Sequence, residues 1–152
     1  MKMNWKNSAQ QWGAIAIIMH WTTAITIISL FALGLWMTGL TYYSEWYQTA
    51  PYIHKSVGIL LVIVTVARLG WRGKEIIPSA LPTHTKAEQT MGHLMHLALY
   101  GLIFGMIVSG YLISTADGRA ISVFGWFEVP ATITSLPQQE DIAGLVHLYM
   151  GY

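Results

Sequence analysis

Histidine is the residue in this sequence best suited to bind a metal or to carry protons. The 152 residues include six histidines, no cysteine and only seven acidic side chains. Five of the six lie in or beside long apolar segments: His20, His54, His93, His96 and His147. The sixth, His84, lies in a polar stretch and is expected to be solvated. A histidine in apolar surroundings needs a partner, so it marks a cofactor or proton site or makes a structural hydrogen bond to a carbonyl. Without cysteine, thiolate-bound iron–sulfur clusters and c-type haem are excluded.

His54 and His147 form the pair best placed to share a ligand. His54 begins the second apolar segment and His147 lies early in the fourth, so both lie toward the same side of a membrane. Two neutral imidazoles at matching depth suit the two axial positions of an iron porphyrin. His20 lies toward the opposite side, and a partner for it on the fourth segment would fall about 13–15 residues beyond His147, past Tyr152.

His93 and His96 lie one helical turn apart at the start of the third apolar segment. This i, i+3 spacing places them on adjoining parts of one helix face. They are candidates to ligate haem, to bind a quinone head group or a haem propionate, or to relay protons, and they also suit a structural role. Zinc is a weaker hypothesis, because Glu88 is the only acidic residue nearby.

The composition indicates an integral membrane protein. Mean hydropathy is +0.47, with 54% hydrophobic and 10% charged residues, whereas soluble domains carry about 25% charged residues. A net charge of +1 gives no reason to expect nucleic acid binding. We therefore expect one all-α domain over residues 1–152, a four-helix transmembrane bundle in the lipid bilayer. The predicted spans cover residues 12–40, 52–71, 87–114 and 141–152. The fourth is too short to cross ~30 Å of hydrocarbon, so we expect it to continue beyond Tyr152. A re-entrant segment and a helix at the membrane interface are the alternatives.

The connecting segments carry turn and interface signals. Residues 41–47 hold four aromatic side chains and predict an aromatic belt or a short surface helix. Pro51 predicts the turn into the second span, and residues 117–119 predict a second turn. Residues 121–130 are expected to form an amphipathic interfacial stretch. Gly101 and Gly105 have the spacing that lets membrane helices pack closely.

Lysine and arginine are distributed unequally between the two sides. Six fall on the side shared by the N-terminus and the second loop: Lys2, Lys6, Arg68, Arg72, Lys74 and Lys86. Lys55 and Arg119 fall on the other. Because cytoplasmic loops carry the positive excess, the N-terminus is predicted to lie in the cytoplasm and the protein in the inner (cytoplasmic) membrane.

Five motifs in order resemble the prokaryotic cytochrome b561 family, which is similar to the di-haem cytochrome b subunits of nickel–iron hydrogenases. They are Ile18-Met-His20-Trp21, His54-Lys-Ser-Val-Gly58, Arg68-Leu-Gly-Trp-Arg72, Gly92-His93-Leu-Met-His96 and Ile121-Ser-Val-Phe-Gly-Trp-Phe-Glu-Val-Pro130. The resemblance covers about residues 11–152.

The resemblance implies a four-helix membrane bundle with two b-type haems that passes electrons between a quinol pool and a redox partner. Because the fourth segment stops at Tyr152, we expect one or two haems per chain. The expected protein partner is a redox protein or a second copy of the chain. The resemblance further implies that His54 and His147 are the two ligands of the outer haem iron. It also implies that His20 is one ligand of the inner haem iron, the second being a histidine late in the fourth helix, past Tyr152. It also makes Arg68, Arg72 and the pair His93/His96 candidates to bind propionates or quinol.

Two other functions remain open. A quinone-binding anchor subunit of a larger redox complex would use the same apolar helices. A proton or metal-ion transporter would use the histidines as a relay, but no acidic residue lies deep in a span and no internal repeat is present.

Overall fold

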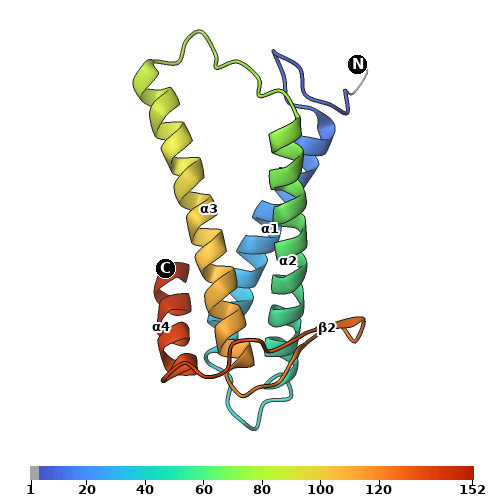
Figure 1. Ribbon diagram of the computed structural model, residues 1–152, viewed down its shortest axis with the longest axis vertical. Helices are drawn as coiled ribbons and strands as arrows, with labels where there is room; N and C mark the ends of the chain where they lie inside the picture. The colour runs from blue at the N-terminus through green and yellow to red at the C-terminus, as the bar shows by residue number, and fades with distance from the viewer. Residues whose placement is uncertain (1–3) are drawn as a thin grey trace.

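A computed structural model describes residues 4–152 as four helices and one short β-hairpin (Figure 1). Lys2, one of the residues used to predict the orientation, lies outside the described residues. The elements are α1 (Ala14–Met37), α2 (Thr49–Lys74), α3 (Lys86–Thr115), β1 (Ile121–Val123), β2 (Phe127–Val129) and α4 (Gln139–Gly151). The predicted helical architecture is confirmed, whereas the 121–130 stretch, predicted only as interfacial, forms the antiparallel β1–β2 hairpin.

Three of the helices are long and apolar enough to cross a membrane: α1, α2 and α3. The shortest of them, α1, has 24 residues, which at ~1.5 Å per residue exceeds the thickness of the hydrocarbon core. Helix α4 has 13 residues. Pro51 does not precede α2 as predicted but lies in its first turn. Proline is tolerated there because backbone N–H groups in the first turn have no acceptor within the helix, so its missing N–H costs no hydrogen bond. Residues 41–47 form turns, not a surface helix, and Trp46 packs edge-on against Trp36.

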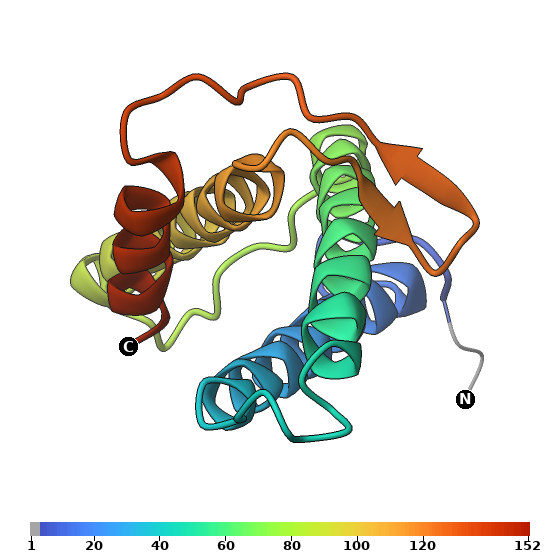
Figure 2. The same cartoon turned by 90° about the horizontal axis from the view of Figure 1, so that it is seen from below.

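The four helices are arranged as two pairs. Helix α1 packs along α2 and α3 packs along α4, while α2 and α3 contact each other over a shorter stretch. Seen along the helices, the α1–α2 pair lies on one side and the α3–α4 pair on the other (Figure 2). A group located between the pairs would therefore be contacted by side chains from both.

The inner end of the first pair, predicted to be cytoplasmic, is held by the segment before α1. The Asn7 backbone N–H donates to Glu75 Oε2 over 3.0 Å, and its side-chain amide donates to the Ile76 carbonyl over 2.9 Å. The Asn7 side-chain oxygen accepts from the Gly13 N–H at 2.8 Å, immediately before α1. One asparagine thus joins the start of α1 to the end of α2.

The outer end is held by the hairpin. Ser56 on α2 is fully buried, and its hydroxyl lies 3.3 Å from both the Ser122 carbonyl and the Phe124 N–H. Val123 of β1 is also fully buried. The predicted turn before the hairpin is confirmed, with Gly118 at a φ of +79°. The hairpin therefore packs on α2 within one turn of His54.

The connection from the hairpin to α4 is fixed to the outer end of α3. The Tyr111 hydroxyl donates to the Pro130 carbonyl and accepts from the Thr132 N–H, both at 2.8 Å. The buried Gln139 amide donates to the carbonyls of Leu112 and Ile133 at 2.9 and 2.8 Å. These bonds position the start of α4 beside α3.

Most large apolar side chains point outward, as expected where lipid replaces water. Ile28 and Phe104, for example, are 67% and 70% exposed. At the α3–α4 contact, a Cβ on Gly105 would lie 2.9 Å from Met150 Sδ, whereas one on Gly101 would meet nothing within 4 Å. Of the predicted glycine pair, Gly105 alone lies at this helix contact.

Candidate functional site

The structure brings together His54 of α2 and His147 of α4. Their imidazole centroids lie 6.2 Å apart with the ring planes at 70°. Both side chains are half-buried, and they belong to different helix pairs. The two histidines that the sequence assigned to one depth therefore face each other across the interior of the bundle.

The ring of His147 is held by α3. Its Nδ1 lies 3.1 Å from the Met106 carbonyl and 3.0 Å from the Ser109 hydroxyl. A carbonyl can only accept, so Nδ1 carries the proton and Nε2 keeps its lone pair. The Ser109 hydroxyl donates in turn to the Gly105 carbonyl at 2.8 Å. These contacts fix the tautomer that leaves Nε2 available to a metal.

Two glycines give the histidine rings their space. A Cβ on Gly34 of α1 would lie 3.4 Å from His54 Cε1, and one on Gly110 of α3 would lie 3.2 Å from His147 Cε1. Sequence reasoning missed both glycines and Ser109. Small residues are common in membrane helices, and the sequence carries no signal that separates these three from the rest.

His54 has no comparable support. Its Nδ1 is buried and has no hydrogen-bond partner within residues 4–152. The pair is thus asymmetric, with Nδ1 hydrogen-bonded in His147 and unpartnered in His54.

A second cluster lies toward the inner end. The Arg68 guanidinium donates from Nη2 to His20 Nδ1 at 2.9 Å, and its Cζ lies 5.7 Å from the centre of the Tyr100 ring. Arg68 of α2 therefore links α1 to α3. Sequence reasoning placed His20 and Arg68 on this side but missed Tyr100, whose buried hydroxyl has no partner among the described residues.

Of the remaining predicted residues, Arg72 lies in the last turn of α2, and the histidine pair lies on the exposed part of α3. His93 and His96 are both exposed, and His96 Nδ1 bonds the Gly92 carbonyl of its own helix at 2.7 Å. That contact satisfies one nitrogen of His96, and the other has no hydrogen-bond partner within residues 4–152. The structure does not bring this pair into the His54–His147 site.

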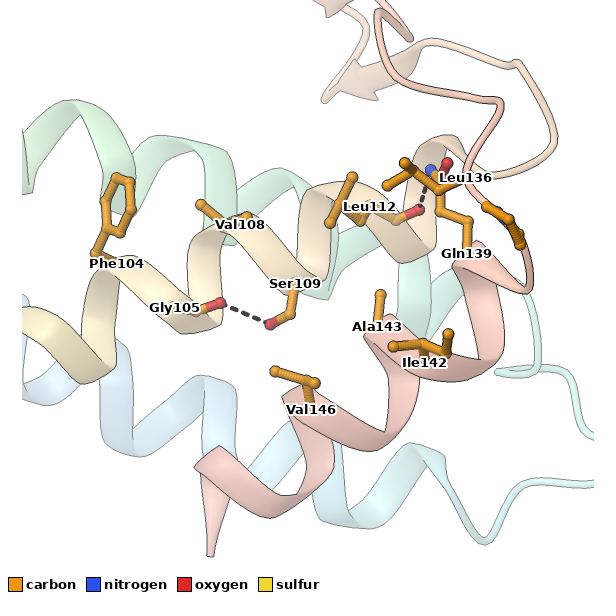
Figure 3. Close-up of a pocket in the computed structure, with 11 residues that line it drawn as sticks. Phe104, Gly105, Val108, Ser109, Leu112, Leu136, Gln139, Ile142, Ala143 and Val146 are labelled. Carbon is orange, nitrogen blue, oxygen red and sulfur yellow. Dashed lines mark hydrogen bonds between the residues drawn. The ribbon is translucent and has the colours of Figure 1, made fainter.

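An open groove of about 320 Å³ runs between α3 and α4 (Figure 3). Its walls are almost wholly apolar and include Phe104, Val108, Leu112, Ile142 and Val146. The Ser109 hydroxyl at its floor is already bonded to Gly105. The groove suits hydrocarbon, and its polar lining is limited to Ser109 and Gln139, neither of which is titratable or a good metal ligand. The histidine clusters are therefore the candidate sites.

Comparison with known proteins agrees with these features. The family model for prokaryotic cytochrome b561 matches residues 11–152. The chain is also 46% identical over 150 residues to "Cytochrome b561 homolog 2" of Escherichia coli (strain K12), covering 99% of this chain and 80% of that protein. The chain therefore belongs to the prokaryotic cytochrome b561 family, as a multi-pass membrane cytochrome b that binds haem and transfers electrons.

Proposed function

We propose that the protein passes electrons between a quinol pool and a redox partner in the cytoplasmic membrane, through a b-type haem with His54 and His147 as axial ligands. The observation that carries this proposal is the 6.2 Å separation of the two imidazole centroids.

That separation fits two rings on one metal ion. A metal–imidazole bond is ~2 Å long and the ring centre lies ~1 Å beyond the nitrogen, so two rings on opposite sides of one ion have centroids ~6 Å apart. The proton on Nδ1 of His147 leaves Nε2 for the metal. Gly34 and Gly110 leave room for the rings. Bound haem supplies a one-electron couple, and the residues of this chain supply its ligation, burial and orientation.

A second, inner haem would use His20. The hydrogen bond from Arg68 bears on this assignment. Because a guanidinium can only donate, His20 Nδ1 is the acceptor, and the single proton of the neutral imidazole lies on Nε2. Ligation through Nε2 therefore requires Arg68 to leave His20, after which its guanidinium is free to pair with a propionate or a quinol oxygen. The inner end also carries His93 and His96 as further polar groups for a quinol. The excess of lysine and arginine at this end supports a cytoplasmic N-terminus.

The test is a reduced-minus-oxidised visible spectrum of the detergent-purified protein, with haem and protein quantified. Double substitution His54→Ala/His147→Ala is expected to remove one haem per chain, while His84→Ala, in the polar loop, leaves the spectrum unchanged. A double variant with the wild-type haem-to-protein ratio would overturn the assignment. A colourless wild-type protein would instead support the quinone-binding anchor.

A further inference from the structure

The two proposed ligands of the outer haem are held in different ways. We infer that His147 is the anchored ligand, that Ser109 positions it, and that His54 is the weaker ligand, whose loss the outer haem survives. This inference rests on the proposed function and deepens it, because it assigns unequal roles to the two sides of one iron.

The anchoring of His147 follows from the donors and acceptors around it. The Ser109 hydroxyl has one proton, and both carbonyls within its reach, Gly105 at 2.8 Å and Met106 at 3.1 Å, can only accept. Its oxygen therefore accepts from His147 Nδ1–H at 3.0 Å. Ser109 is itself 3% exposed, so it has little freedom to turn away. With the Met106 carbonyl, His147 has two acceptors on one N–H.

The backbone of α3 further limits the His147 ring. Gly110 lies so close that even a methyl group there would stand 3.2 Å from Cε1. An imidazole whose second nitrogen donates to such acceptors is a more basic ligand and keeps its orientation when the metal bond breaks. His147 is therefore expected to retain the iron when one axial bond is lost.

Within residues 4–152, His54 lacks the hydrogen bonds that hold the ring of His147. Its Nδ1 is buried without a partner in the described part of the chain, which is an unfavourable state for an N–H. Its glycine neighbour, Gly34, leaves a slightly wider gap, 3.4 Å to Cε1. When its bond to iron breaks, the ring gains freedom to turn and find a partner. The Fe–His54 bond is accordingly the one expected to open.

The first experiment compares His54→Ala and His147→Ala in the full chain, by haem content and by titration with imidazole. His54→Ala is expected to keep the outer haem in a five-coordinate form whose Soret band shifts back when imidazole is added. His147→Ala is expected to lose it. Equal loss in both variants, or retention only in His147→Ala, would overturn the inference while leaving the proposed function intact. If both single variants and the double variant keep wild-type haem, the proposed function itself fails.

The second experiment tests Ser109 with a conservative change that leaves both histidines in place. Ser109→Ala removes an acceptor from Nδ1–H, so His147 becomes a weaker donor and the midpoint potential of the outer haem is expected to rise. Thr115→Val is the matched control, because Thr115 is fully buried on the same helix and its hydroxyl bonds the Tyr111 carbonyl at 2.8 Å without contacting His147. An unchanged potential in Ser109→Ala, or an equal rise in the control, would overturn the positioning role.

Discussion

Arg68 Nη2 lies 2.9 Å from His20 Nδ1, and the same guanidinium lies over the ring of Tyr100, so one side chain connects three helices near the inner end of the bundle. Within residues 4–152, no other arginine forms a hydrogen bond with a histidine. Arg72, four residues further along α2, is the natural comparison.

Substitution of Arg68 is expected to destabilise the inner end more than substitution of Arg72. In protein that holds no inner haem, Arg68→Gln loses a charge-assisted hydrogen bond to His20 and a cation–π contact with Tyr100, worth together about 2–4 kcal/mol. The midpoint of thermal unfolding in detergent should fall for Arg68→Gln and hold for Arg72→Gln. The spectrum of the outer haem should stay the same in both. Equal shifts in the two variants would mean that the Arg68 contacts contribute nothing specific.

Filling the space beside His147 is expected to weaken haem binding. A Cβ at Gly110 would stand 3.2 Å from the ring, and a valine there would displace it. Gly110→Val should therefore purify with less haem per chain than wild type. Gly144→Val on α4 is the control, since a Cβ there meets nothing within 4 Å. Full haem content in Gly110→Val would show that the ring tolerates the displacement.

The α3–α4 contact is expected to depend on Gly105 and not on Gly101. A leucine at Gly105 would need the space that the end of the Met150 side chain occupies, so Met150 must turn aside and the α3–α4 contact that carries His147 is expected to loosen. Gly105→Leu should lower both haem content and thermal stability, while Gly101→Leu should leave both near wild type. The outcome against this prediction is an equal loss from both variants, which would place both glycines at packed interfaces.

Two buried hydroxyls on α2 are expected to respond in opposite ways to removal. Ser56 bonds the hairpin, so Ser56→Ala should cost about 1–2 kcal/mol of stability by leaving buried backbone groups unpaired. Thr65 has a buried hydroxyl with no partner among the described residues, so Thr65→Val should be neutral or stabilising. The midpoint of thermal unfolding of each purified variant, compared with wild type, should therefore fall for Ser56→Ala and should not fall for Thr65→Val.

The sequence predicted the elements that depend on local pattern. The lengths of the apolar segments predicted α1, α2 and α3. Because successive helices cross the membrane in opposite directions, the sequence also predicted that His54 and His147 lie at one depth. The strands of the hairpin have only three residues each, too few for a periodicity to be recognised, and their position depends on Ser56, far away in the chain.

The residues that contact the two histidines could not be predicted from the sequence for a related reason. Ser109 is one of several small polar residues in apolar helices, and its importance comes from an acceptor role toward a histidine on another helix. Gly34 and Gly110 are important because they have no Cβ, which would crowd the imidazole rings of His54 and His147. Such roles depend on which helices become neighbours, and nothing in local composition encodes that choice.

The location of His54 and His147 on separate helix pairs also bears on biosynthesis. The ribosome delivers α1 and α2 to the membrane before α4, so the proposed ligand set is completed only when the last of these helices arrives. Haem capture would then join the first-made pair to the last-made pair, and haem supply would act as a checkpoint on maturation. Chains made in haem-deprived cells are expected to be degraded faster in a pulse-chase experiment, because their two halves are then held together only by the hairpin, the α2–α3 contact and Arg68.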